Sequence, residues 1–393
     1  MDKSQCPVCL NSNSHLIDEF QKYNLIVSPR EFYFCEHCFH LYQKKSETKD
    51  LKSFDYLRGE RRTMRSSLRD LSFKIEKRFN LKAKDIVLDI ASNDGTFLRT
   101  FDIAGLVLVG VESESGFIDE AKTGLDYFIH DSWNARSFEM IVGRKAKVIT
   151  SLFALPRNHA PLTFLRDIES SLRDDGICIL EVPTLCDFFD FRDLGIISSE
   201  TTHLFSLKSL KILIENAQLE IFDLEQVVVG GHALRLYCRK KNSYVENENG
   251  ALGIRQYLEH EKENLNIEAL KKNFFRLDLE KKKLKQFLLK AKEESKTVWV
   301  YGLDQASDTL LNFFQIKKED LSGIYELSDK RAGQLHPILN LRMLDKEQMK
   351  KEKPDYFLVL PYHFINEFYQ TEVDRRQEGT IFVLPLPEFR VVE

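Results

Sequence analysis

The chain is 393 residues long, more than one ordinary hydrophobic core organises, so we expect two or three domains. Hydrophobic residues make up 43% and charged residues 30%, a composition typical of soluble globular proteins. The formal net charge of −4 gives no electrostatic reason to expect a nucleic acid or an anionic membrane surface as partner.

No apolar signal segment is visible in the first residues, MDKSQCPVCL, and no apolar run approaches the roughly 20 residues that a membrane helix needs. We therefore expect a cytoplasmic protein without a membrane partner. Cysteine usage agrees with a reducing compartment, because four of the seven cysteines form two C-x-x-C pairs and the others lie in or beside apolar segments. A disulfide scaffold is not expected.

The first elements in chain order are the two cysteine pairs, CPVC and CEHC. Each pair can direct two thiolates at one point, and two pairs together supply the tetrahedral sulfur set that Zn²⁺ accepts. His37 and His40 are less favoured substitute ligands. Four sulfur ligands close the site, so we expect a structural zinc ion in a small module, held by Cys6, Cys9, Cys35 and Cys38.

Strand-like runs alternate with helical patterns in the middle of the chain. The strand-like runs cover residues 86–90, 106–111, 147–151 and 177–182. Between them, SGFIDEAKTG and APLTFLRDIESSLRDDG repeat apolar residues at spacings of three and four, which is typical of amphipathic helices. This alternation predicts a parallel sheet covered by helices, and such sheets bind ligands at the carboxyl ends of their strands.

The small-residue turn in DIASNDGTFL follows the first of these strands and lacks the glycine signatures that cradle phosphates. Gly95 would let the backbone approach a ligand closely, and Asp89 offers an acceptor suited to an ammonium or hydroxyl group. Glu112 ends the next strand, where a carboxylate suits the two hydroxyls of a ribose. A ribose and a cationic tail without phosphates are the features of S-adenosylmethionine.

We therefore expect S-adenosylmethionine as cofactor at this end of the sheet. Asp131, in FIHDSW, would accept the exocyclic amine of adenine, and Trp133 would lie near enough to stack. A plain loop at Asp131 and a solvent-exposed strand end at Glu112 are the alternatives. The expected cofactor contacts are Asp89, Ala91, Ser92, Asn93, Gly95, Glu112 and Asp131.

With these motifs the chain resembles, over essentially its full length, the S-adenosylmethionine-dependent sugar C-methyltransferases of deoxysugar and surface-glycan pathways. The paired cysteines match the family's zinc module, DIASNDGTFL looks like its cofactor motif, and VGVESES looks like its ribose-binding strand end. VVVGGHALRLYCRK is similar to its closing strand. Towards the C-terminus, KTVWVYGLDQASDTLLNFFQI, IYELSDKRAGQLHP and FVLPLPEFRVV are similar to its last domain.

The resemblance implies an α/β fold with a class I SAM-methyltransferase (Rossmann-like) core, a small N-terminal zinc-binding module and a second, C-terminal Rossmann-like α/β domain. We place the zinc module at residues 1–50, the methyltransferase domain at 51–243, a charged helical linker at 244–295 and the C-terminal domain at 296–393. The linker has leucines at helical spacing. This spacing predicts one or two long solvated helices or, alternatively, a coiled-coil dimer seam.

The resemblance also implies a reaction, C-methylation of a keto sugar, which needs a base beside the carbonyl and a group that stabilises the enediolate. The family has a Glu-His pair before a Phe-Ser-x-x-Ser-Leu stretch. In SSETTHLFSLKSL, Glu200 matches the Glu, Thr201 stands at the His position, and His203 follows two residues later. We expect His203 and Glu200 as catalytic residues, with Tyr56 of SFDYLRGE beside them, because a threonine hydroxyl needs activation to act as a base. Packing roles are the alternatives for His203 and Tyr56.

The expected function is therefore S-adenosylmethionine-dependent C-methylation of a nucleotide-linked keto-deoxysugar in glycan or secondary-metabolite assembly, by a monomer or homodimer. The substrate would lie in the cleft between the central and C-terminal domains, as the resemblance implies. Asp304 and Asp308 put negative charge in the C-terminal turn where the family has small residues and a lysine. Methylation of an oxygen or nitrogen of a different small molecule, and a catalytically silent SAM-binding protein, are the alternatives.

Overall fold

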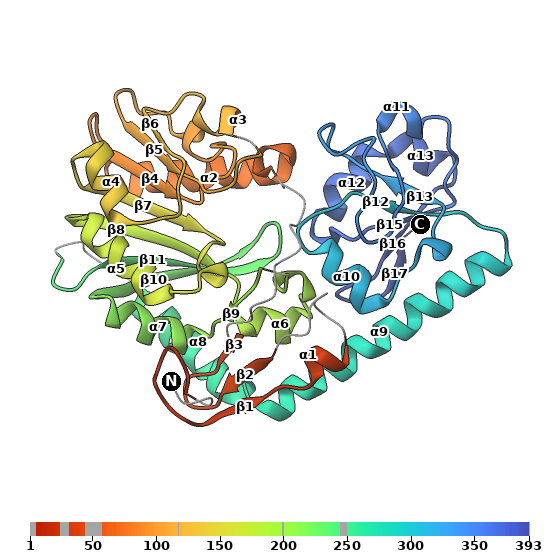
Figure 1. Ribbon diagram of the computed structural model, residues 1–393, viewed down its shortest axis with the longest axis horizontal. Helices are drawn as coiled ribbons and strands as arrows, with labels where there is room; N and C mark the ends of the chain where they lie inside the picture. Colours follow the sequence, from red (N-terminus) through yellow and green to blue (C-terminus); the bar gives the residue numbers. More distant parts are fainter. Residues whose placement is uncertain are drawn as a thin grey trace.

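Three β-sheets organise the chain in the computed structural model, which describes residues 5–23, 31–43, 57–116, 118–198, 200–243 and 250–392. Figure 1 shows the central and C-terminal sheets side by side, with the N-terminal sheet below them. The N-terminal sheet has the order β1-β2-β3-β9, and a short helix α1 lies between β1 and β2 in the chain. Its elements are β1 (Ser14–Leu16), α1 (Glu19–Lys22), β2 (Phe32–Cys35), β3 (His40–Gln43) and β9 (His203–Leu204).

The central sheet has seven strands in the order β10-β11-β8-β7-β4-β5-β6. β4 pairs in parallel with both β5 and β7, so the chain order reverses beside β4, and ligands of such sheets bind at that switch point. The four strands predicted from the sequence are confirmed as β4, β5, β7 and β8. The strands are β4 (Ile86–Ile90), β5 (Val107–Val111), β6 (Tyr127–Ile129), β7 (Ala146–Leu152), β8 (Leu172–Val182), β10 (Leu219–Val228) and β11 (His232–Lys240).

Helices cover both faces of the central sheet because successive strand residues point to opposite faces. On one face, Leu71 and Ile75 of α2 pack with Val87 of β4 in one buried cluster. On the other, Leu165 of α5 packs with Leu88 in a second cluster. The two predicted helices are confirmed as α3 and α5. The helices are α2 (Arg62–Arg78), α3 (Ile118–Lys122), α4 (Ala135–Val142), α5 (Pro161–Ser171), α6 (Leu185–Phe191) and α7 (Leu207–Asn216).

The C-terminal sheet has six strands in the order β14-β13-β12-β15-β16-β17, parallel except for the last pair. This second parallel α/β sheet confirms the expected Rossmann-like domain. Its strands are β12 (Val298–Tyr301), β13 (Gly323–Tyr325), β14 (Met343–Leu344), β15 (Tyr356–Leu358), β16 (Ile381–Leu384) and β17 (Arg390–Val392). Its helices are α10 (Ser307–Phe314), α11 (Lys346–Met349), α12 (Ile365–Thr371) and α13 (Val373–Gln377).

Two helices, α8 (Gly250–Asn264) and α9 (Ile267–Glu293), join the central and C-terminal domains where the sequence predicts a helical linker. Figure 1 shows α9 running from beneath the N-terminal sheet to the C-terminal domain. The helix is solvated on one face only, because Leu270, Phe274, Leu277 and Leu284 are fully buried within the chain. Its leucine stripe therefore packs inside this chain. In the part of the chain that the structure describes, no helix is long and apolar enough to cross a membrane.

Phe274 connects α9 to two other parts of the fold. Its ring lies 5.3 Å from that of Phe20 in α1 and 5.4 Å from that of Phe188 in α6. We expect Phe274→Ala to lower the free energy of unfolding by about 3–5 kcal/mol, the usual cost of emptying a buried aromatic site. Phe275→Ala is the matched control, because that neighbouring ring is 59% exposed and its loss should change stability by under about 0.5 kcal/mol. Urea unfolding of the two variants tests this, and equal losses would contradict the packing role of Phe274.

Candidate active site

A cavity of about 770 Å³ lies between the central and C-terminal domains. Its walls include the turn after β4, the ends of β5 and β7, and the segment around residues 193–201. The C-terminal domain contributes Asp304, Gln305 and Ala306 after β12 and His363 and Phe364 after β15. The cavity therefore opens at the carboxyl ends of the parallel strands, where the sequence places the ligand.

The turn after β4 is held in an unusual backbone conformation that brings its residues to the cavity wall. Ala91, Asn93 and Gly95 all have positive φ angles, 58°, 52° and 73°. Gly95 is required here, because a Cβ at this position would lie 2.6 Å from the carbonyl oxygen of Ala121. Ala91 and Asn93 line the cavity, whereas Ser92 is buried behind them with its hydroxyl unpartnered among the described residues.

Glu112 lines the cavity from the end of β5 and is only 6% exposed. Its Oε2 accepts a hydrogen bond from the backbone N–H of Asn93 at 2.8 Å. Its Oε1 accepts from the backbone N–H groups of Ser113 and Glu114 at 2.8 and 3.0 Å. Three backbone donors thus fix the carboxylate in the cavity wall, and each carboxylate oxygen has more than one acceptor position. The alternative of a solvent-exposed strand end is not supported.

Asp89 is fully buried at the end of β4 and lies behind the cavity wall. Its Oδ1 accepts from the hydroxyl of Thr150 at 2.6 Å, and its Oδ2 lies 3.8 Å from a guanidinium nitrogen of Arg58. Arg58 itself lines the cavity, donates to the carbonyl of Leu152 and was not identified from the sequence. Burial raises the pKa of Asp89 to about 7, although Arg58 and Thr150 oppose this shift.

The raised pKa of Asp89 predicts a pH dependence of stability. Between about pH 4 and pH 7 the folded protein retains a proton that the unfolded chain has lost, so this group stabilises the fold at low pH and loses that contribution as the pH rises. We expect the difference in free energy of unfolding, Asp89→Asn minus wild type, to increase from pH 5 to pH 8. The increase should be at most about 1.4 kcal/mol per unit of the pKa shift. Urea unfolding at both pH values measures it, and a pH-independent difference would contradict it.

Asp131 and Trp133 both line the cavity after β6. Asp131 accepts hydrogen bonds from the backbone N–H of Ser132, the side-chain amide of Asn134 and the hydroxyl of Ser137. The indole of Trp133 donates to the carbonyl of Phe164 at 3.2 Å. The structure therefore brings Asp131 and Glu112 to the same cavity.

Of the three predicted catalytic residues, Glu200 lines the cavity, together with Thr201. The carboxylate of Glu200 lies 3.1 Å from the guanidinium of Arg157, which also lines the cavity and hydrogen-bonds to Gln305 of the C-terminal domain. The sequence did not single out Arg157 as a site residue. Tyr56 lies outside the described residues, and the structure says nothing of its position.

His203 lies in β9, is 5% exposed and is not part of the cavity wall that the described residues form. Its Nδ1 is 3.1 Å from Nε2 of His40, and its ring lies 5.1 Å from that of His40 and 5.3 Å from that of Phe205. Burial lowers the pKa of His203 to about 4. Glu200 thus faces the cavity, whereas His203 pairs with the N-terminal sheet.

The cavity also holds a group of residues that the sequence analysis missed. Asp193, His232 and His363 have side-chain ligand atoms within 4.8 Å of one another. Asp193 precedes the short helix at Leu194–Ile196, His232 begins β11 and His363 lies in the short helix at Tyr362–Phe364. These positions are far apart in the chain, so no local spacing signals the cluster.

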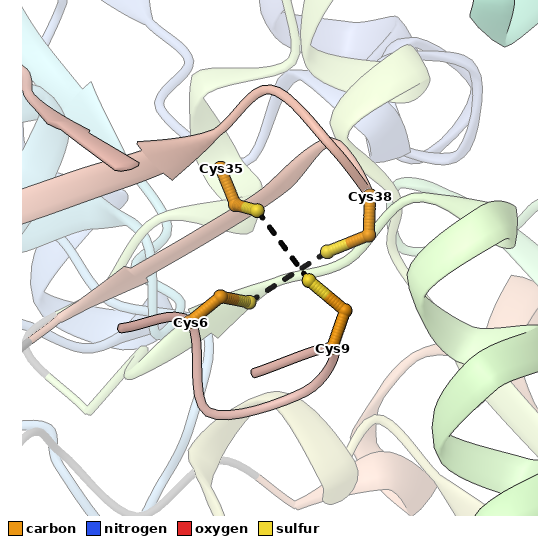
Figure 2. Close-up of side chains that lie close together, drawn as sticks. All are labelled: Cys6, Cys9, Cys35 and Cys38. Atoms are coloured by element: carbon orange, nitrogen blue, oxygen red, sulfur yellow. Dashed lines mark hydrogen bonds between the residues drawn. The ribbon is translucent and has the colours of Figure 1, made fainter. Parts of the chain in front are cut away.

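The four cysteines of the N-terminal module converge as predicted (Figure 2). The sulfur atoms of Cys6 and Cys38 are 3.6 Å apart, as are those of Cys9 and Cys35. All four are free cysteines in the structure. His40 lies outside this set of four, with Nδ1 3.6 Å from the sulfur of Cys6.

Two family models match this chain. Residues 56–224 match a methyltransferase domain, and residues 228–387 match the C-methyltransferase C-terminal domain. C-methyltransferase NovU from Streptomyces niveus is 23% identical over 322 residues, which are 80% of this chain and 76% of that protein.

Solved structures resemble one part of the chain. An S-adenosylmethionine-dependent methyltransferase from Clostridium acetobutylicum ATCC 824 is 11% identical with a TM-score of 0.36, over 45% of this chain and 92% of that one. The 1,6-didemethyltoxoflavin-N1-methyltransferase from Burkholderia thailandensis is 16% identical with a TM-score of 0.34, over 52% and 96%.

The two matched domains and the relative define the class of protein: the chain is an S-adenosylmethionine-dependent methyltransferase with a class I, Rossmann-like α/β core. The two models match consecutive parts of the chain, and together with the relative they support a C-methyltransferase family.

Proposed function

We propose that this enzyme transfers a methyl group to a carbon of a keto-deoxysugar, nucleotide-linked, in glycan or secondary-metabolite biosynthesis. The single observation that carries the proposal is one cavity that both domains line. The methyltransferase domain contributes the Glu112 carboxylate, and the C-methyltransferase C-terminal domain contributes Asp304, Gln305 and His363. One cavity built by both domains supports a methyl donor on one side and an acceptor on the other. Its volume of about 770 Å³ is in the range of small-molecule sites.

The residues at the end of the central sheet fit S-adenosylmethionine, which supplies an electrophilic methyl group. Glu112 would accept the ribose hydroxyls, since its carboxylate faces the cavity and is fixed by three backbone donors. Asp131 would accept the adenine amine beside Trp133. Ala91 and Asn93 would present backbone and side chain to the amino-acid tail, with Asp89, Ser92 and Gly95 supporting the turn from behind.

Arg157 suits the charge that C-methylation creates. Removal of a proton beside a carbonyl puts negative charge on the carbonyl oxygen, and a preorganised cation at that oxygen lowers the barrier. Arg157 lines the cavity between Glu200 and Gln305, so it would stabilise this oxygen from the acceptor side. Glu200 would orient Arg157. That Glu200, His203 or Tyr56 removes the proton stays a prediction.

The four-cysteine cluster fits a structural zinc ion. A tetrahedral site with Zn–S bonds of about 2.3 Å has sulfur atoms about 3.8 Å apart. The distances of 3.6 Å in two of the pairs are close to this value, and four thiolates leave no open position for catalysis. We propose that Cys6, Cys9, Cys35 and Cys38 hold Zn²⁺ and that the ion stabilises the N-terminal sheet.

Incubation with a nucleoside-diphosphate keto-deoxysugar and S-adenosylmethionine tests the function. We expect S-adenosylhomocysteine and a methylated sugar nucleotide in equal amounts by mass spectrometry. Binding of the methyl donor without a methylated product from the nucleotide-linked or the free sugar would contradict the proposal.

The acidic turn after β12 favours a second candidate, methylation of an oxygen or nitrogen of an acceptor without a diphosphate. Asp304 lines the cavity and accepts from the hydroxyl of Ser307 and the backbone N–H of Ala306. A carboxylate in this position repels phosphate oxygens. An acceptor without a diphosphate that is methylated on oxygen or nitrogen, faster than the nucleotide-linked sugar is methylated on carbon, would favour this candidate.

A further inference from the structure

Asp193 holds two histidines in the cavity between the domains. Its Oδ1 accepts from Nε2 of His363 at 3.0 Å and from the hydroxyl of Tyr362 at 2.8 Å. Its Oδ2 is 3.4 Å from Nδ1 of His232 and accepts from that residue's backbone N–H at 3.1 Å. The backbone N–H of Gly195 donates to Oδ1 as well. Asp193 is completely buried, and it lines the cavity together with both histidines.

These contacts determine which imidazole nitrogen can accept a proton. A buried carboxylate accepts an N–H, so His363 carries its proton on Nε2 and leaves Nδ1 unprotonated when neutral. Among the described residues, Nδ1 of His363 and Nε2 of His232 have no hydrogen-bond partner. An imidazole whose N–H is held by a buried aspartate is the arrangement by which enzymes orient a histidine base and stabilise its protonated form.

Two glycines, Gly195 and Gly231, lie close to Asp193 and His363. A Cβ at Gly195 would lie 3.1 Å from Oδ1 of Asp193 and 3.5 Å from Nε2 of His363, and a Cβ at Gly231 would lie 3.4 Å from Oδ2. Gly231 also has a φ angle of 123°, which favours glycine. Two glycines of the cavity wall therefore border the aspartate, and a Cβ at Gly195 would make a tight contact with its Oδ1.

We propose that His363, oriented by Asp193, is the general base of the methyl transfer. This inference rests on the proposed function. The C–H bond beside the acceptor's carbonyl breaks, its proton goes to Nδ1 of His363, and its electron pair forms the enolate. That pair then makes the new carbon–carbon bond to the methyl group as the S–CH₃ bond of the donor breaks. The proton leaves His363 to solvent. The base thus comes from the C-terminal domain and its orienting carboxylate from the central domain.

The groups that face His363 predict how the rate of methyl transfer depends on pH. They are Asp193, His232, Tyr362 and Asp304, each from a different segment. Burial lowers the pKa of His363, but the charge of Asp193, its hydrogen bond to the ring and the charge of Asp304 outweigh burial, so the net pKa is raised above its usual value. Because only the neutral ring accepts a proton, the rate should fall as the pH drops through this pKa. Asp193→Asn should move that limb to lower pH while lowering the maximal rate.

The test is exchange of the acceptor's α-proton in D₂O, followed by ¹H NMR, with a nucleoside-diphosphate keto-deoxysugar as probe and S-adenosylhomocysteine in the donor site. We expect His363→Gln to slow both exchange and methyl transfer by about 100-fold or more, the usual contribution of a general base. His260→Gln is the control, because it removes a surface Asp–His pair, Asp190–His260 at 2.8 Å, and should leave both rates unchanged. Unchanged binding of S-adenosylhomocysteine by calorimetry shows that the variants fold.

Exchange at the wild-type rate in His363→Gln would overturn the proposal, and a loss confined to Glu200→Gln would assign the base to Glu200. Wild type that neither exchanges nor methylates the probe contradicts the proposed function instead. In that case ¹⁵N NMR of the His363 ring tests the assignment of the base. A proton on Nε2, and a pKa of His363 that is lower in Asp193→Asn than in wild type, would support the assignment. Protonation on Nδ1, or a second equivalent of metal bound by these three side chains, overturns it.

Discussion

Replacing Glu112 with Gln is expected to weaken binding of S-adenosylmethionine and S-adenosylhomocysteine at least about 100-fold. The carboxylate faces the cavity and would accept both ribose hydroxyls, and a hydrogen bond to a charged group contributes about 1.5–3 kcal/mol. The backbone N–H groups of Asn93, Ser113 and Glu114 all donate to this carboxylate. The side-chain amide of the Glu112→Gln variant would place its own N–H donors against some of these groups. Isothermal titration calorimetry measures the dissociation constants directly.

Glu139→Gln is the control for this prediction, since it removes a carboxylate on the exposed side of α4 in the same domain. Its affinity for both ligands should equal that of wild type. Nearly wild-type affinity of the Glu112 variant would show that the cofactor's ribose is held elsewhere and would remove the main support for the proposed cofactor contacts.

Replacing Cys38 with Ala is expected to abolish zinc binding and to unfold the N-terminal sheet. Structural zinc sites of four thiolates contribute on the order of 10 kcal/mol in small modules, far more than the side chain's packing. The effect should reach the cavity, because the hydroxyl of Ser206 donates to the carbonyl of Cys38 and His40 contacts His203 in β9. Metal analysis should give one zinc per chain in wild type and none in the variant, and amides of β2 and β3 should lose protection from hydrogen exchange.

Cys178→Ala is the matched control, because this cysteine is fully buried in β8 and belongs to neither C-x-x-C pair. It should keep one zinc per chain and a protected N-terminal sheet. A zinc-free wild type with a protected sheet would contradict the structural role of the metal.

The elements that the sequence predicts correctly are those whose signal is local. The strands β4, β5, β7 and β8 follow from short apolar runs, and the place of Glu112 in the cavity wall follows from its position after β5. The spacing of the four cysteines, in two C-x-x-C pairs, predicts that they form one cluster. In each case the residues that cooperate either lie within one element or end neighbouring parallel strands, whose carboxyl ends meet at one edge.

The parts that the sequence does not predict depend on contacts between distant segments. The segment at residues 203–204 completes the N-terminal sheet, so His203 packs against His40 and away from the cavity. Asp193 and His363 are brought together by the packing of two domains. The local sequence around each residue does not indicate this contact. Arg58 and Arg157 look like ordinary surface arginines in the sequence because their partners, Asp89 and Glu200, lie far along the chain.

The position of the transferred methyl group tests the central claim most directly. The enzyme is incubated with S-adenosylmethionine labelled with ¹³C in its methyl group and with the nucleoside-diphosphate keto-deoxysugar, and the product is examined by ¹³C NMR. We predict a labelled methyl bonded to a sugar carbon adjacent to the carbonyl. A label bonded to oxygen or nitrogen would contradict the claim that this cavity performs C-methylation.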